Sequence, residues 1–116
     1  MNPGKTGEAL ALKHLEEKGL VLVARNYRFD RAETDLIFKD DNKKLLLFVE
    51  VKTRTSNKFA EPEDSINTLK QRQMLKSAEG FLYENGQYED YEKRFDVISV
   101  LLDNETCTIK HLEDIF

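Results

Sequence analysis

The sequence predicts an α/β protein in which helices flank a mixed central sheet. Short segments rich in Val, Leu, Ile and Phe alternate with two longer amphipathic segments, in the order α-β-β-β-α-β-β. One strand-like segment, residues 44–53, is almost continuously apolar, which is typical of a central strand covered on both faces. No repeat or Pro/Gly-rich linker divides the 116 residues, so we expect one domain over residues 1–116.

The first half of the chain predicts one helix and three strands. Residues 7–18 form the helix, since Leu12 and Leu15 share one side and Gly19 suits the left-handed position after a helix. Residues 20–28 and 34–39 are the first two strands. The turn-forming Asp40-Asp41-Asn42 leads into the third strand, residues 44–53.

The second half predicts a long helix and two further strands. The helix covers about residues 65–84 and ends at Asn85-Gly86. Its expected apolar stripe consists of Ile66, Leu69, Leu75, Ala78 and Leu82. Residues 94–102 and 106–112 form the last two strands.

Composition excludes several classes of protein. The longest apolar run, residues 45–49, is far too short to cross a membrane, and the N-terminus lacks the apolar core of a signal peptide. The single Cys107 forms no internal disulfide, and the two histidines lack zinc-ligand spacing. We therefore expect a cytoplasmic protein without a membrane partner.

The distribution of charge permits nucleic-acid binding despite a net charge of −4. Residues 43–76 carry eight basic and four acidic side chains, a balance of +4, so the rest of the chain holds −8. A chance clustering of solvated helix and loop charges would give the same pattern. The asymmetry allows a nucleic-acid partner without establishing one.

Two charged residues interrupt the most apolar strand. Alternation along a strand places Glu50 and Lys52 on one face and the neighbouring valines on the other. If residues 39 and 44 pair in a hairpin, Asp35 lies opposite Phe48 and diagonal to Glu50, on that same face. The opposite face then receives an unbroken apolar set: Leu36, Phe38, Leu45, Leu47, Val49 and Val51.

This grouping has the residue types of a metal-dependent phosphodiesterase. Carboxylate oxygens from Asp35 and Glu50 suit Mg²⁺ or Mn²⁺, which keep waters and accept substrate phosphate oxygens as further ligands. Lys52 can orient a water or stabilise the charge that develops on the phosphate. Metal-assisted hydrolysis of a phosphodiester bond is therefore the leading hypothesis.

Five blocks of the sequence, in this order, resemble the PD-(D/E)xK nuclease superfamily. They are Gly7-Glu8-x-x-Ala11, Glu33-Thr34-Asp35-Leu36-Ile37, Phe48-Val49-Glu50-Val51-Lys52-Thr53-Arg54, Lys70, and Arg94-Phe95-Asp96-Val97. The set is most similar to the small bacterial YraN-type family, which is related to archaeal Holliday junction resolvases. The resemblance implies a restriction-endonuclease-like αβββαβ core. It also implies an active site of Glu8, Asp35, Glu50 and Lys52, with the three carboxylates as metal ligands.

The predicted activity is cleavage of DNA, on branched or structured substrates, by a Mg²⁺- or Mn²⁺-dependent endonuclease. Arg54, Lys58 and Lys70 are the candidate phosphate contacts. A homodimer is expected if two strands are cut symmetrically. The alternative is a nucleic-acid binding or recruitment module that keeps the fold and cleaves nothing.

Each candidate residue also has a purely structural interpretation. Glu50 and Lys52 could form an ion pair on a partly exposed strand, and Asp35 could end a turn. Glu8 is electrostatically favoured near a helix N-terminus without any function. The basic candidates on the loop and second helix could be solvated surface charges, and Arg94 with Asp96 is expected to be a structural pair.

Overall fold

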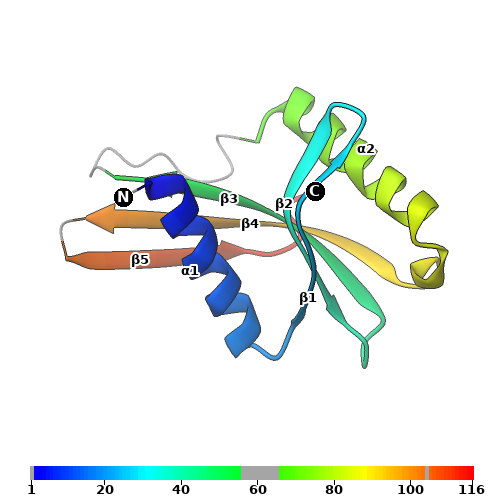
Figure 1. Cartoon of the computed structure of the whole chain (residues 1–116), viewed down its shortest axis with the longest axis horizontal. Helices are drawn as coiled ribbons and strands as arrows, with labels where there is room; N and C mark the ends of the chain where they lie inside the picture. The colour runs from blue at the N-terminus through cyan, green and yellow to red at the C-terminus, as the bar shows by residue number, and fades with distance from the viewer. Residues whose placement is uncertain (1, 56–65, 104) are drawn as a thin grey trace.

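The computed structural model describes residues 2–55, 66–103 and 105–116. Five strands form one sheet in the order β1-β2-β3-β4-β5, with helices packed against it (Figure 1). The elements are α1 (Pro3–Glu17), β1 (Val21–Phe29), β2 (Ala32–Asp40), β3 (Leu45–Arg54), α2 (Thr68–Glu84), the short 3₁₀ helix η2 (Gly86–Tyr88), β4 (Glu92–Asp103) and β5 (Thr106–Leu112). Among the strands of the described residues, β3 and β4 run parallel and the other pairs antiparallel, so the sheet is mixed, as predicted.

The two helices begin at asparagine caps. The Asn2 side chain accepts hydrogen bonds from the backbone N–H groups of Gly4 and Lys5, and Pro3 follows it, so α1 starts earlier than the predicted residue 7. Asn67 accepts from the Lys70 N–H at 2.8 Å, which starts α2 at Thr68 rather than at residue 65.

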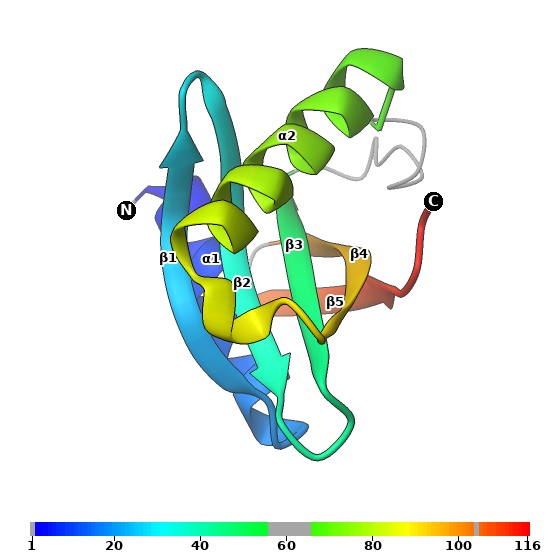
Figure 2. The same cartoon turned by 90° about the vertical axis from the view of Figure 1, so that its right-hand side faces the viewer.

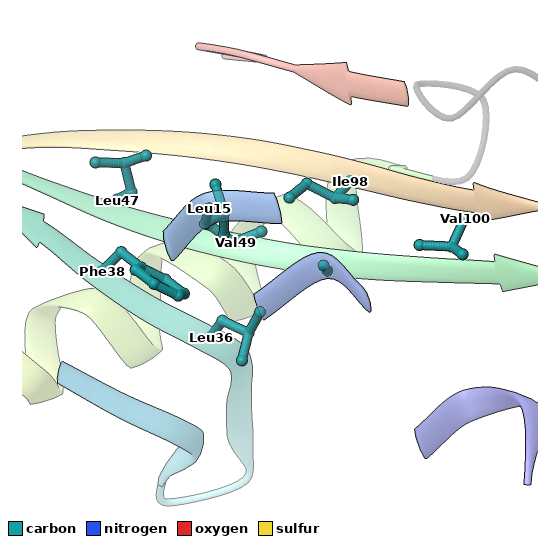
Figure 3. Packing of buried hydrophobic residues seen from close by; sticks show 8 residues of the cluster. Leu15, Leu36, Phe38, Leu47, Val49, Ile98 and Val100 are labelled. Carbon is teal, nitrogen blue, oxygen red and sulfur yellow. The ribbon is translucent and has the colours of Figure 1, made fainter. Parts of the chain in front are cut away.

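The helices cover opposite faces of the sheet. Figure 2 shows α2 crossing in front of β1, β2 and β3, with α1 behind them. The α1 face buries one apolar cluster, most of which is labelled in Figure 3: Ala11, Leu15, Leu36, Phe38, Leu47, Val49, Ile98 and Val100. The predicted apolar face of β2 and β3 is confirmed, because Leu45 and Val51 also pack against this cluster. Within the described residues, neither helix is long and apolar enough to cross a membrane.

The predicted register of the β2–β3 hairpin is wrong by two residues. Asp40 pairs with Leu45, and Leu36 pairs with Val49, so the turn lies at residues 41–44. Lys44 closes this turn in a left-handed conformation with φ of 49°. A two-residue shift preserves the faces of a regular strand, so the predicted apolar face survives the error.

The predicted apolar stripe of α2 is only partly correct. Leu69 and Leu75 are 63% and 42% exposed, whereas the helix buries Met74, Ala78 and Phe81 against β2 and β3. The buried face also contains Ser77 and Gly80, which periodicity in large apolar residues does not detect. A Cβ on Gly80 would overlap the Phe29 ring, so this small residue allows α2 to approach the β1–β2 hairpin.

Candidate active site

The centre of the candidate site lies where β2 separates from β3. The last paired residues of the two strands are Leu36 and Val49, and Asp35 and Glu50 lie one step beyond them. From that point β1 and β2 continue as a paired hairpin as far as Phe29 and Ala32. Figure 1 shows this hairpin rising away from the outer end of β3. Asp35 and Glu50 therefore lie at the point where the hairpin and β3 diverge.

Asp35 takes over a backbone hydrogen bond that the separating strands no longer make. The Val51 N–H donates to Asp35 Oδ2 at 2.8 Å. Burial raises the pKa of Asp35 to about 6, and the nearby Glu50 carboxylate acts in the same direction, against the Val51 N–H and Lys70. The Asp35 carboxylate is thus held in place by a hydrogen bond. Its interaction with the Glu50 carboxylate agrees with the predicted proximity of the two residues.

A change of face in the β1–β2 hairpin brings Asp35 to this position. Leu36 packs in the α1 cluster, but Thr34, two residues earlier, hydrogen-bonds to Ser77 of α2. Residues two apart in a regular strand share a face, so the alternation breaks at Asp35. Asn26, which lies between the neighbouring paired positions of β1, has a φ of 50°. A left-handed residue inside a strand is rare, and Asn tolerates it better than most residues.

Glu50 is the most buried of the predicted site residues. Its side chain is 8% exposed, and its Oε1 atom lies 3.0 Å from Lys70 Nζ and 3.6 Å from Lys52 Nζ. The ion pair that the structural interpretation expected between Glu50 and Lys52 is present, but its carboxylate is buried rather than partly exposed. Glu50 Oε2 is buried and has no hydrogen-bond partner among the described residues. A buried carboxylate oxygen without a partner is costly unless a ligand satisfies it.

Glu8 approaches the site from the other face of the sheet. Burial raises the pKa of Glu8, and the Asp35 carboxylate raises it further, while Arg25 and Asn26 oppose the shift. Gly7 explains why α1 comes so close, since a Cβ at this position would lie 2.0 Å from Thr53 Oγ1. The glycine beside Glu8 thus lets the helix contact β3 directly after Lys52.

The predicted phosphate contacts have three different outcomes. Lys70 belongs to the site itself, through its ion pair with Glu50. Arg54 is half-buried at the end of β3 and donates to the Thr53 carbonyl at 3.1 Å. Lys58 lies outside the described residues. Sequence reasoning missed Asn26, although an asparagine within an otherwise strand-like segment is a signal of irregular backbone.

The described residues fit a divalent cation only in part. Asp35 and Glu50 offer hard carboxylate oxygens, and the partnerless Glu50 Oε2 is an atom that a cation would satisfy. No group of three Asp, Glu, His or Cys side chains converges closely enough to hold a metal in the part of the chain described. Glu8 therefore does not join the two carboxylates as a third direct ligand in this conformation. A Mg²⁺ ion commonly uses one or two carboxylates and completes its shell with water and phosphate oxygens.

A second charged cluster, around Asp96, holds the C-terminal segment in place. Asp96 is fully buried and accepts hydrogen bonds from Arg94 Nε and Nη2, from His111 Nε2 and from the Asp114 N–H. The Ile115 N–H adds a bond to the Phe95 carbonyl. These contacts agree with the structural role expected for Arg94 and Asp96.

Comparisons with known sequences place the chain among similar proteins of many bacteria. A model of the family described as "Uncharacterised protein family UPF0102" matches residues 7–100. A UPF0102 protein of Natranaerobius thermophilus is 44% identical, over 97% of this chain and 95% of the relative. UPF0102 proteins of Chlorobium chlorochromatii and Geobacter metallireducens are 40% and 37% identical, over 97% of this chain and 89% and 90% of the relatives.

Proposed function

This chain belongs to the UPF0102 family, and we propose that it is a metal-dependent endonuclease of the PD-(D/E)xK type that hydrolyses DNA phosphodiester bonds. The observation that carries the proposal is the pair of carboxylates Asp35 and Glu50 at the point where β2 and β3 separate, with Lys52 beside them. The αβββαβ order and the mixed sheet are consistent with that superfamily.

The carboxylates and the lysine have different proposed roles in hydrolysis. Asp35 and Glu50 would hold Mg²⁺ or Mn²⁺, which supplies charge stabilisation at the phosphate and activation of the attacking water when bound. Asp35 is fixed by the Val51 N–H, so its carboxylate is positioned before a cation arrives. Glu8 lies near enough to Asp35 for that carboxylate to raise the pKa of Glu8, and it would act through water rather than as a direct ligand.

Lys52 is the proposed catalytic cation. It lies on the same face of β3 as Glu50, with its ammonium 3.6 Å from Glu50 Oε1 and its side chain 23% exposed. A partly exposed ammonium group can donate to a phosphate oxygen as negative charge develops there. Arg54, two residues farther along β3, is expected on the same face by strand alternation and is a proposed contact to a nucleic-acid backbone.

The proposal also includes a cellular compartment and an oligomeric state. A single exposed cysteine, Cys107, is compatible with a reducing cytoplasm. A homodimer would place two such sites around a two-fold axis and allow cuts in both strands of a branched DNA. Both features stay predictions.

A non-catalytic nucleic-acid binding module is the second candidate. It is favoured by the two lysines that already neutralise Glu50 and by the missing third ligand among the described residues. Such a module would bind DNA equally well with and without a divalent metal. An endonuclease would need the metal for cleavage.

A panel of labelled substrates tests the proposal. Four-way junction, flap, single-stranded and duplex DNA are incubated with the protein in Mg²⁺, Mn²⁺ or EDTA. A Glu50→Gln variant runs beside an exposed-residue control, Glu79→Gln. We expect metal-dependent cleavage that Glu50→Gln abolishes and Glu79→Gln retains. Unchanged DNA in every lane, with all proteins folded and bound to DNA, would favour the binding module.

A further inference from the structure

Two ammonium groups compete for one oxygen of Glu50. Lys70 Nζ lies 3.0 Å from Oε1 and Lys52 Nζ lies 3.6 Å from the same atom, while Oε2 has no partner among the described residues. The side chain of each lysine is 23% exposed and that of Glu50 is 8% exposed, so solvent screens these charges only weakly. Lys70 is therefore the closer counter-ion of the buried carboxylate.

The two lysines differ in how the fold holds them. Lys52 belongs to the same strand as Glu50, and β3 is paired with β4 over its whole length. Lys70 reaches Glu50 from the first turn of α2, where its backbone is fixed by the Asn67 cap. Its four-carbon side chain can leave Glu50 without any movement of the helix. Lys70 is thus the counter-ion that can be exchanged.

We propose that Lys70 is a displaceable counter-ion that neutralises Glu50 in the metal-free protein and yields its place to a divalent cation. This inference rests on the proposed metal-dependent function. A cation at Glu50 and Asp35 would lie close to the Lys70 ammonium, and like charges at such a distance in a half-buried site repel strongly. Binding of the cation and the Lys70 ion pair are therefore mutually unfavourable.

The exchange would also free the Lys70 ammonium to bind a substrate phosphate. A Lys70 ammonium that leaves Glu50 remains at the N-terminal end of α2, where a substrate phosphate bound at the carboxylates would be within its reach. A cation at the site restores the positive charge that Glu50 loses when Lys70 departs. Lys70 then binds phosphate only in the metal-loaded protein, so substrate contact and metal loading are coupled.

Binding of Mn²⁺, measured by calorimetry without DNA, tests the exchange. Lys70→Met removes the competing charge, and we expect its Mn²⁺ affinity to rise about fivefold or more, the lower end of typical coupling between two ligands. Lys70→Arg keeps the charge and is expected to bind as the wild type does. Lys76→Met is the matched control, because Lys76 lies on the same helix but pairs with Asp30 at 2.8 Å. Lys70→Gln replaces Lys70→Met if the latter does not fold.

The outcomes separate this inference from the proposed function. Equal or weaker Mn²⁺ binding by Lys70→Met, with binding intact in the wild type, overturns the exchange and leaves the nuclease proposal standing. Absence of Mn²⁺ binding in all folded proteins overturns both. In a second measurement, the affinity for a labelled four-way junction is compared in Ca²⁺ and EDTA. We expect Lys70→Met to lose more affinity in Ca²⁺ than in EDTA, and an equal loss would overturn the phosphate contact.

Discussion

Asp35 and Glu50 lie one step beyond the last paired residues of β2 and β3, and the Glu50 carboxylate raises the pKa of Asp35. Neither carboxylate would be expected inside a sheet, yet each has a structural reason to be there. Asp35 replaces a missing ladder bond by accepting from the Val51 N–H, and Glu50 is neutralised by two lysines. The acidic pair therefore lies where the two strands separate.

Asparagine and alanine at position 35 should separate the structural from the chemical role of the carboxylate. Asp35→Asn keeps an oxygen that can accept from the Val51 N–H, so we expect folding to be retained and metal-dependent cleavage to be lost. Asp35→Ala leaves that N–H without its partner. Its free energy of unfolding should therefore be about 1–3 kcal/mol lower than that of Asp35→Asn. Urea denaturation in EDTA measures the difference. Equal stability of the two variants would mean that the hydrogen bond contributes nothing.

The pH dependence of stability should reveal the buried carboxylate. The pKa of Asp35 is raised from 3.8 to about 6, so the folded state favours the protonated form. This stabilisation is complete below pH 3.8 and is lost as the pH rises through about 6. The wild type should therefore lose stability between pH 4 and pH 7, whereas Asp35→Asn lacks this titration. The difference in unfolding free energy should shift in favour of Asp35→Asn by on the order of 1–3 kcal/mol over that range. Denaturation curves in EDTA at several pH values give the result, and a constant difference would contradict it.

Substitution of Gly7 should disrupt the contact of α1 with β3. A Cβ at position 7 would overlap Thr53 Oγ1, so we expect Gly7→Ala to destabilise the protein by about 1–3 kcal/mol, although alanine favours helices. Gly4→Ala is the matched control, since its Cβ would meet only Asn2 Oδ1 at 3.4 Å. Thermal unfolding of both variants measures the effect. A Gly7→Ala variant as stable as Gly4→Ala would show that α1 does not pack this closely.

Asp96 should matter for stability and not for chemistry. Burial acts to raise its pKa, but hydrogen bonds from His111, Arg94 and the Asp114 N–H outweigh burial and lower the pKa overall. Its stabilisation is present above pH 3.8 and lost as the pH falls. Asp96→Ala leaves buried donors without an acceptor and should cost about 3–5 kcal/mol. Amide exchange at Asp114 and Ile115 should accelerate with it. Unchanged exchange at both amides would refute this role.

The sequence predicted the site residues better than it predicted their geometry. Glu50 and Lys52 share a face because strand alternation is a local rule, and their apolar surroundings indicated burial. The hairpin register depended on which residues form the turn, and composition did not reveal the left-handed Lys44 that shifts it. The ion pair between Lys70 and Glu50 joins residues from two elements, so only the packing of α2 on the sheet could show it.

The left-handed backbone of Asn26 and the break in alternation at Asp35 were the largest omission. Periodicity describes regular strands, whereas Asp35 reaches its position through a break in the alternation of the β1–β2 hairpin. Periodicity was also insufficient for α2, where the predicted core residues Leu69 and Leu75 are exposed. Helical spacing marked large apolar residues, but close packing against β1 and β2 selected the face that carries Ser77 and Gly80.

Single-turnover cleavage by Lys52→Met tests the central claim most directly. Lys52 touches Glu50 but supplies no metal ligand, so the variant should bind Mn²⁺ and DNA while its cleavage rate falls at least about a hundredfold, as is typical for loss of a catalytic group. Lys76→Met, an exposed lysine on α2, should cleave at the wild-type rate. Equal cleavage by wild type and Lys52→Met would contradict the account. So would the absence of cleavage by folded, DNA-bound wild type in either Mg²⁺ or Mn²⁺.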